Sequence, residues 1–179
     1  MVRTTVATVL VDAFDRVREQ VPEVLEGLDQ PALTWRPDAA ANPIAWLIWH
    51  LTRVQDDHLA GVAAALGHDG ADQVWTAGGW ARRFGLAFDD DAIGYGHTSA
   101  EVAQVRSPAH LLAGYHGAVH EATVAIIDGL GDTDYDAVVD TRWTPPVTTS
   151  VRLVSVVNDA TQHIGQAAYV RGLWDRRST

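Results

Sequence analysis

The polar residues best placed to do chemistry lie near the end of the chain, in the stretch SVRLVSVVNDATQHIGQAAYVRGL at residues 150–173. Asp159 and His163 are four residues apart, so on a helix they share one face one turn apart, and Gln166 follows on the same side. A carboxylate and an imidazole at this spacing can bind one divalent metal ion, or they can hydrogen-bond to each other. An exposed pair of the second kind contributes roughly 0.2–0.5 kcal/mol.

A third metal ligand has to come from another helix, and the segment WLIWHLTRVQDDHL offers three candidates. His50 lies on the flank of the apolar stripe of this segment, and Asp57 shares its face two turns further on. His58 lies nearer the apolar centre, where it is either a rival ligand or a hydrogen-bonded core histidine. Spacing alone does not separate these candidates.

The remaining polar motifs offer less. His110, His116 and His120 fall outside the apolar stripe of their own segment, so we predict that they face solvent. We expect Gln166 to brace its helix or to hydrogen-bond near the metal. The sequence has no Gly-x-Ser-x-Gly nucleophile motif and no glycine-rich phosphate-binding loop. The potential metal site is therefore the main candidate for chemistry.

Four long segments must position these residues. In each of them apolar residues recur every three or four positions, which predicts an amphipathic helix. Capping residues mark the starts of these helices: Thr4 or Thr5, Asn42 before Pro43, Ser107 before Pro108, and Ser150. The predicted helices cover residues 4–27, 43–66, 108–128 and 150–173.

The connections between these helices complete the predicted fold. Residues 68–106 form a long connection that is unusual for a compact domain, and we predict short helical turns in it near 80–84 and 99–105. Residues 135–149 alternate between apolar and polar side chains, which predicts a short extended excursion or hairpin. The prediction is an all-α four-helix bundle with a long crossover between helices 2 and 3, in a single domain spanning residues 1–179.

Composition narrows the function. The chain has no cysteine, which excludes disulfides, thiolate nucleophiles and cysteine-ligated zinc within it. A formal net charge of -10 argues against binding to nucleic acid or to an anionic membrane, since both require a basic surface. No signal-peptide pattern and no run of about 18 apolar residues is present, so we expect a cytoplasmic protein. Because symmetric dimers are the commonest soluble oligomers, we also expect a homodimer.

Two segments, NPIAWLIWHLTRVQDDHL and NDATQHIGQAAYVRGL, together resemble the DinB-like superfamily. This superfamily includes bacillithiol-S-transferases and the metal-binding domain of mycothiol-dependent maleylpyruvate isomerase. The resemblance implies a metal site formed by His50, Asp159 and His163, where Asp159 stands at a position that is commonly histidine in the family. Two imidazoles and one carboxylate can still bind zinc, nickel or iron(II) and leave coordination positions open.

The function implied by the resemblance is a metal-dependent enzyme that uses a low-molecular-weight thiol of the mycothiol type as cosubstrate. The metal would favour the thiolate, which attacks an electrophile and either transfers the thiol or isomerises a double bond. The alternative is a non-catalytic, stress-related binding or sensor module with a vestigial metal site. The metal content of the purified protein, followed by saturation with a thiol, distinguishes the two.

Overall fold

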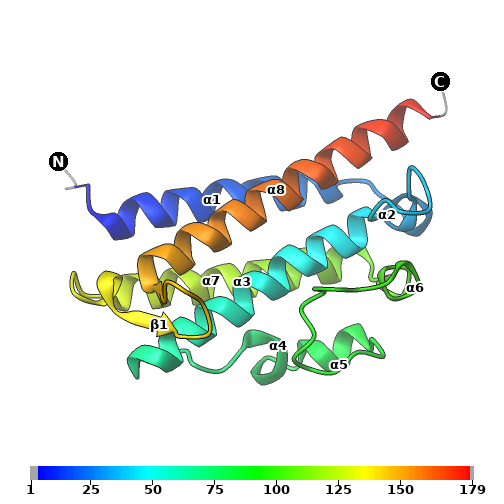
Figure 1. Ribbon diagram of the computed structural model, residues 1–179. Coiled ribbons are helices and arrows are strands. Elements are labelled where there is room, and N and C mark those ends of the chain that lie inside the picture. Colours follow the sequence, from blue (N-terminus) through cyan, green and yellow to red (C-terminus); the bar gives the residue numbers. More distant parts are fainter. Residues whose placement is uncertain (1–3, 178–179) are drawn as a thin grey trace.

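The computed structural model describes residues 4–177, which form a bundle of long helices with a small hairpin at one end (Figure 1). The first helix, α1, spans Val6–Leu25. The hydroxyl of Thr5 accepts a hydrogen bond from the backbone N–H of Thr8, and the hydroxyl of Thr8 accepts one from the backbone N–H of Thr5. This reciprocal capping box satisfies two backbone donors at the start of the helix, as the predicted cap requires.

Three more long helices complete the bundle: α3 (Ile44–Leu66), α7 (Ala109–Gly129) and α8 (Thr149–Arg176). Both α1 and α3 pack against α7 and α8. The predicted all-α bundle with a crossover between the second and third long helices is confirmed. The last helix is longer than predicted at both ends: Thr148 rather than Ser150 caps its start, and the helix continues to Arg176.

The second and third long helices begin one residue later than the sequence predicts. Pro43 and Pro108 take the cap positions in place of Asn42 and Ser107, and both prolines have extended backbone. α3 ends as predicted at Gly67, which has a left-handed backbone with φ of +69°. Glycine adopts this conformation at little steric cost, and its N–H reaches back to carbonyls of the last turn.

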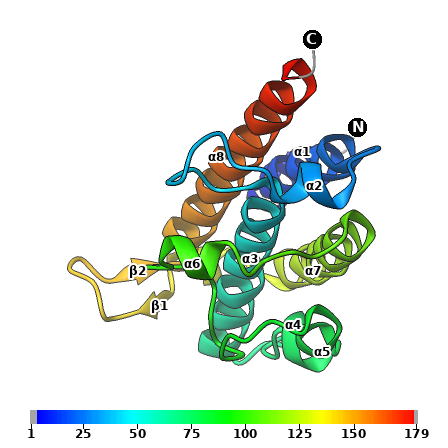
Figure 2. The same ribbon diagram turned by 90° about the vertical axis from the view of Figure 1, so that its right-hand side faces the viewer.

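Short helices occupy the connections on either side of α3 (Figure 2). The crossover from α3 to α7 carries α4 (Val74–Ala77), α5 (Trp80–Phe84) and α6 (Ser99–Val102), and α2 (Gln30–Thr34) precedes α3. The turns predicted near 80–84 and 99–105 are confirmed. α2 and α4 have no counterpart in the prediction.

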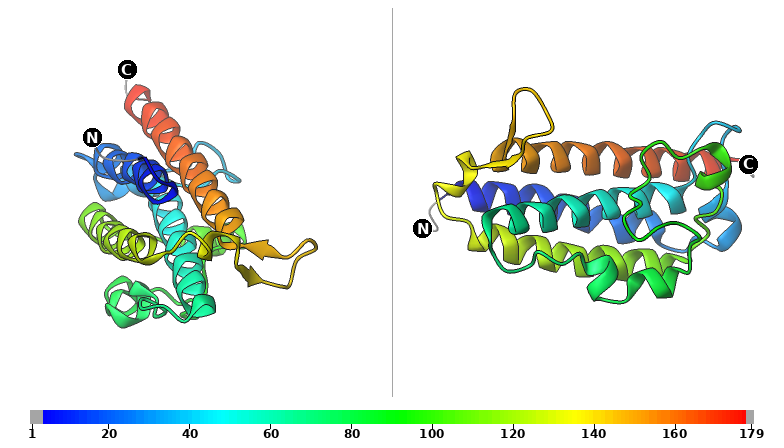
Figure 3. Two further views of the ribbon diagram at one scale, coloured as in Figure 1. Left: turned by 90° about the vertical axis from the view of Figure 1, so that its left-hand side faces the viewer. Right: turned by 60° about the horizontal axis from the view of Figure 1, so that its bottom comes forward.

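The connection from α7 to α8 forms the hairpin predicted for residues 135–149. It consists of a 3-10 turn, η1 (Asp134–Asp136), and two antiparallel strands, β1 (Val138–Asp140) and β2 (Val147–Thr148). Val138 pairs with Thr148 and Asp140 pairs with Val147. The hairpin projects from the bundle and leads directly into α8 (Figure 3). It therefore lies beside the first turns of the helix that carries the candidate ligands.

The core is centred on α3. Every residue from 44 to 56 is buried, because α7, α8, α2 and α4 all pack against this helix. His50, Arg53 and Asp56 lie inside this stretch, so their polar groups must find partners within the protein. Among the helices of residues 4–177, none is both long enough and apolar enough to cross a membrane.

Candidate metal centre

α3 and α8 bring three potential metal ligands together. His50 extends from α3, and Asp159 and His163 extend from α8. One ligand atom of each residue lies within 4.8 Å of the other two. The imidazole rings of His50 and His163 meet at a steep angle, with centroids 4.6 Å apart. Within residues 4–177, no other group of three or more such side chains converges in this way.

Hydrogen bonds leave one nitrogen of each imidazole free. Nδ1 of His50 donates to the backbone carbonyl of Ile93, and Nδ1 of His163 donates to the backbone carbonyl of Asp159 at 2.9 Å. A carbonyl oxygen can only accept a hydrogen bond, so Nδ1 carries the proton in both rings and Nε2 keeps its lone pair. Metal-bound histidines are usually oriented by a hydrogen bond of this kind from the other ring nitrogen.

Asp159 contributes a buried oxygen without a hydrogen-bond donor. Its Oδ2 is shielded from solvent and accepts no hydrogen bond, although it lies 3.3 Å from Nδ1 of His163 as an ion-pair contact. Burying a carboxylate oxygen without a donor is unfavourable, and a cation at this position would remove that cost. Two imidazoles and one carboxylate at this separation therefore fit a divalent metal such as zinc, nickel or iron(II).

The two histidines differ in their electrostatic surroundings. Burial, reinforced by the neighbouring His163, lowers the pKa of His50 to about 4, so His50 is neutral at neutral pH. Burial acts in the same direction on His163, but the carboxylate and backbone carbonyl of Asp159 outweigh it and raise the pKa of His163. A metal binds the neutral form of both rings, so it must displace any proton that Asp159 favours on His163.

The crossover segment before α6 supports His50 closely. Gly94 has φ of +101°, and a Cβ at this position would lie only 2.6 Å from Nδ1 of His50. On α3 itself, the ring of Trp46 stacks on His50 with centroids 4.5 Å apart, and the ring of Tyr95 meets it edge-on at 5.5 Å. His50 is thus held between two aromatic rings and a backbone approach that only glycine allows.

A cavity of about 800 Å³ opens beside the ligands, on the side of the hairpin, and we call it the hairpin cavity. Tyr95, which contacts His50, lies in its wall, as does Ser155, one turn before Asp159 on α8. Apolar side chains in the wall come from Ile93, Val147 and Val151. Charged and aromatic side chains from α3, the hairpin and α8 supply its remaining members: Asp57, His58, Asp140, Arg142, Trp143 and Arg152. This lining suits a polar ligand.

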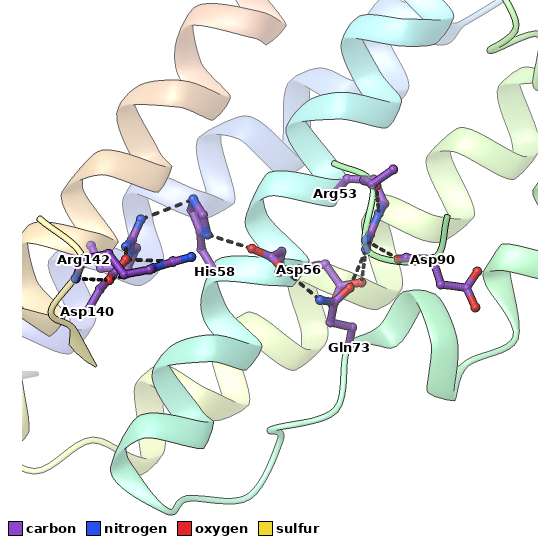
Figure 4. A network of polar contacts seen from close by, with 10 residues as sticks. Arg53, Asp56, His58, Gln73, Asp90, Asp140 and Arg142 are labelled. Atoms are coloured by element: carbon purple, nitrogen blue, oxygen red, sulfur yellow. Dashed lines mark hydrogen bonds and ion pairs between the residues drawn. The ribbon is translucent and has the colours of Figure 1, made fainter. Parts of the chain in front are cut away.

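A chain of polar contacts runs along the cavity wall past Asp140 and His58 (Figure 4), and its hydrogen bonds fix Arg152 in place. Nη2 of Arg152 donates to Oδ2 of Asp140 at 2.7 Å, and its Nη1 lies 3.4 Å from Nε2 of His58. Nδ1 of His58 lies 3.0 Å from Oδ2 of Asp57. Because arginine can only donate, Nε2 of His58 accepts and Nδ1 donates. Hydrogen bonds from Arg142, with Arg152 beside them, hold the pKa of Asp140 far below its usual range.

The same chain reaches Arg53, whose side chain is completely buried. The amide of Gln73 donates to Asp57, and its oxygen accepts from Nη1 of Arg53, both at 2.8 Å (Figure 4). Arg53 also donates to the backbone carbonyls of Asp90 and Ala92. The buried guanidinium of Arg53 therefore ties the crossover to α3. The tie lies immediately before the crossover residues that contact His50.

The other candidates on α3 lie away from this centre. Asp57 and His58 bind each other and line the hairpin cavity. The structure thus distinguishes these two residues from His50, whereas their spacing in the sequence did not. Gln166 is exposed and lines a second cavity, and no hydrogen bond from its side chain to Asp159 or to the helix backbone is present in the described residues.

The prediction that the histidines of α7 face solvent is correct for His110 and wrong for two others. His116 and His120 are 1% and 7% exposed. α7 packs against both α1 and α3, so it buries a wider arc than its apolar stripe indicates. His116 contacts the hydroxyl of Thr52 at 3.2 Å, and His120 forms an ion-pair contact with Asp15 at 3.0 Å.

Sequence patterns did not identify the residues that support the site from the crossover and the hairpin. Ile93, Gly94 and Tyr95 fall in a glycine-rich loop, and Arg152 lies in the first turn of α8 between Val151 and Leu153. A tyrosine between Gly94 and Gly96 was the available signal, because glycines around an aromatic residue often mark a close backbone approach.

The fold and the site define a class of protein: a four-helix bundle with a potential metal site between its second and fourth long helices. A family model described as mycothiol-S-transferase matches residues 9–176. The chain therefore belongs to the mycothiol-S-transferase family, which confirms the DinB-like resemblance.

A solved structure agrees with this assignment. The crystal structure of a conserved protein from Enterococcus faecalis superposes with a TM-score of 0.83 and is 30% identical in sequence. The similarity covers 94% of this chain and 96% of that one, so the two proteins share the whole fold. A comparison with curated proteins gives no match.

Proposed function

We propose that this chain binds one divalent cation through His50, Asp159 and His163 and transfers a low-molecular-weight thiol of the mycothiol type to an electrophile. The observation that carries the proposal is the convergence, within 4.8 Å, of two imidazoles with free Nε2 atoms and a carboxylate whose buried oxygen has an ion-pair contact with His163 but no hydrogen-bond donor. The family adds the chemical class of the thiol and favours transfer over isomerisation.

The residues have distinct roles in this proposal. Nε2 of His50, Nε2 of His163 and a carboxylate oxygen of Asp159 hold the cation. A divalent cation in this position lowers the pKa of a thiol that reaches it and so increases the fraction of thiolate at neutral pH. The carbonyl of Ile93 and the ring of Trp46 keep the first of these ligands in its binding orientation. The chain has no cysteine, so no thiol of its own competes with the cosubstrate.

The hairpin cavity supports the choice of a mycothiol-type thiol. A glycosidic thiol carries many hydroxyl groups, which hydrogen-bond to charged side chains such as Asp57 and Arg152. The exposed ring of Trp143 offers an apolar face to a sugar ring. The volume of about 800 Å³ suits a small molecule of this size, and Tyr95 places the inner end of the cavity beside His50.

Metal binding tests the proposal directly. We expect the purified protein to bind a single equivalent of zinc or nickel in a calorimetric titration, and His163→Ala to lose that binding. His110→Ala is the matched control, because this histidine is exposed on α7 and does not belong to the converging group of ligands. Transfer of mycothiol to a model electrophile should then require the cation and stop when a chelator removes it. A protein that binds no cation, or that loses it equally in both variants, contradicts the proposal.

We also propose that the protein acts in the cytoplasm as a homodimer. Low-molecular-weight thiols are kept reduced in the cytoplasm, where this chemistry has its cosubstrate. Val6 and Val9 on the outer face of α1 are more than half exposed and offer apolar surface to a second subunit. Light scattering that reports a monomer at micromolar concentration would contradict the dimer.

A further inference from the structure

A second cavity, of about 660 Å³, lies further along the same face of α8. We call it the loop cavity, because residues 37–42 form one side of it, and the start of α3 and the second half of α8 form the other. Ser155, Asp159, His163 and Gln166 follow one another at steps of four, four and three residues. A single face of α8 therefore runs from the hairpin cavity, past the candidate ligands, to the loop cavity.

The directions of α3 and α8 place the two cavities on opposite sides of the ligands. His58 lies next to Arg152, whereas Trp46, earlier in α3, contacts His163, later in α8. The two helices are therefore antiparallel, as Figure 1 also shows. Moving from the ligands toward the start of α3 is the same as moving toward the end of α8, and this direction leads away from the hairpin.

The loop cavity begins one helical turn from the ligands on both helices. Leu47 precedes His50 by three residues, Gln166 follows His163 by three residues, and both line the cavity. One turn of helix rises about 5.4 Å. A molecule in the loop cavity therefore has its near end next to the ligands, on the side that a thiol in the hairpin cavity leaves open.

The two cavities differ in the charged side chains of their walls. The hairpin cavity is lined by two carboxylates and two guanidinium groups. The loop cavity has one charged side chain in its wall, Asp38, and this carboxylate is turned toward its own loop, where Oδ1 accepts hydrogen bonds from the backbone N–H groups of Ala40 and Ala41. Apolar side chains, two amides (Asn42 and Gln166) and the ring of Tyr169 make up the remainder.

We propose that the loop cavity binds the electrophilic acceptor and selects an uncharged molecule that carries a carbonyl or similar acceptor for the amide of Gln166. This inference rests on the proposed function, because an S-transfer needs a second substrate that approaches the sulfur from a direction the thiol does not occupy. The wall of this cavity has no cationic side chain to pair with the charge of an anionic acceptor. Gln166 thus positions the acceptor instead of bracing its helix.

The transfer step needs no further reactant. The thiol loses its proton to solvent, and the thiolate sulfur attacks a carbon of the acceptor that bears a leaving group such as chloride. The carbon–sulfur bond forms as the carbon–chloride bond breaks, and chloride leaves with the bonding electron pair. The acceptor in the loop cavity and the thiol in the hairpin cavity place these two atoms side by side.

Gly165 allows the loop cavity to be filled without disturbing the fold. It lines the cavity, lies inside α8, and a Cβ built on it meets nothing within 4 Å. We expect Gly165→Leu to raise the KM for benzyl chloride about tenfold and to leave the KM for mycothiol and the metal content unchanged. Gly117→Leu is the matched control, because this glycine also lies inside a long helix with nothing near its Cβ position. The control should change none of these quantities.

Charge selection gives a second readout in the wild-type protein. We expect kcat/KM for 4-(chloromethyl)benzoate, the anionic analogue, to be about tenfold lower than for benzyl chloride after correction for the uncatalysed reactions. Equal values, or a preference for the anion, would overturn the proposed selectivity. A rise in the KM for mycothiol in Gly165→Leu would instead assign the loop cavity to the thiol and overturn the inference.

Direct binding separates this inference from the proposed function. N-benzylacetamide is an uncharged aromatic molecule with a carbonyl group and no leaving group, so its binding can be followed by NMR in the metal-free protein. We expect it to bind the wild-type protein and Gly117→Leu and to bind Gly165→Leu about tenfold more weakly. Failure of metal binding and transfer with this result intact removes the proposed function only. Equal binding to all three proteins removes the acceptor site.

Discussion

Gly94 lies against His50 so closely that a single added carbon at Gly94 would overlap Nδ1 of the imidazole, at 2.6 Å. The contact also brings the carbonyl of Ile93 within hydrogen-bonding distance of the same nitrogen. The orientation of one candidate ligand therefore depends on a backbone approach from the crossover, which lies more than forty residues further along the chain.

The first prediction concerns this approach. Gly94→Ala should push the crossover away from His50 and release its ring, so we expect metal affinity to fall about tenfold and stability by about 1–3 kcal/mol. Gly96→Ala is the control, since Gly96 also has positive φ, +73°, but nothing lies within 4 Å of its Cβ position. Competition with a chromophoric chelator and urea denaturation measure the two effects. Equal loss of metal affinity in both variants would show that backbone strain, not the contact, is responsible.

The second prediction concerns Asp159. Asp159→Ala should weaken metal binding by at least about 100-fold, because losing even an outer partner of a ligand costs about 10–100-fold. Asp159→His should retain the metal and shift preference toward nickel or zinc. Gln162→Ala, an exposed change one residue before His163, serves as the control. Metal affinity that is untouched in Asp159→Ala would reduce this residue to a helix-surface carboxylate and return Asp57 or His58 to consideration.

The third prediction concerns Arg53. Its guanidinium lies 3.5 Å from the carboxylate of Asp56, and both side chains are buried. Arg53→Met leaves that carboxylate without its cation and cuts the crossover loose, so we expect a loss of about 3–5 kcal/mol in the free energy of unfolding. The double variant Arg53→Met with Asp56→Asn should recover part of the loss, because it removes the unpaired charge. Urea denaturation measures the stability of both variants. If the double variant is no more stable than Arg53→Met, the charge explanation is ruled out.

The fourth prediction concerns the hairpin cavity. Arg152 and Arg142 both bind Asp140, but the side chain of Arg152 is 14% exposed and that of Arg142 is 84% exposed. An exposed ion pair contributes roughly 0–1 kcal/mol, so we expect Arg142→Met to leave the KM for mycothiol nearly unchanged. Arg152→Met should raise this KM about tenfold. Initial rates at varied thiol concentration measure this. Identical KM values in the two variants would remove Arg152 from the thiol site.

The fifth prediction concerns pH and His116. Burial lowers the pKa of His116 to about 3, below its ordinary value near 6.5. Between these pH values the unfolded chain binds a proton that the folded protein does not, so stability falls as pH drops from about 6.5 toward about 3, by at most about 1.4 kcal/mol per unit. His116→Leu should flatten this slope, and His110→Leu on the exposed side of α7 should not. Urea denaturation at pH 7, 6 and 5 compares the slopes, and a wild-type slope in His116→Leu contradicts the assignment.

The long helices could be predicted because each has an apolar stripe that persists for several turns. The pair Asp159 and His163 could be predicted for the same reason, since their spacing alone places them on one face. The choice of His50 over His58 could not be made from spacing. It depends on where α3 crosses α8, and only the family resemblance favoured His50 before the structure separated the two residues.

The histidines of α7 show why burial was harder to predict than helix position. An apolar stripe indicates the face that contacts one neighbour, but α7 packs against α1 and α3 and also meets α4 and α5, so His116 is polar on a buried face. Its hydroxyl partner, Thr52, comes from a different helix. The same holds for the crossover, where the Gly-Tyr-Gly pattern at 94–96 indicates a close backbone approach but not which helix residue it meets.

The division of the candidate ligands between α3 and α8 has a mechanical consequence. A cation shared by His50 and the pair on α8 would cross-link two helices that are far apart in the sequence, in a chain that has no cysteine with which to form a disulfide. Such a cation binds only the folded chain. At a free metal concentration of about 100 times Kd, it would therefore add roughly 2.7 kcal/mol to the free energy of unfolding. The melting temperature of the protein would then report the metal supply, and depletion of metal would loosen the helix pair on which both cavities are built.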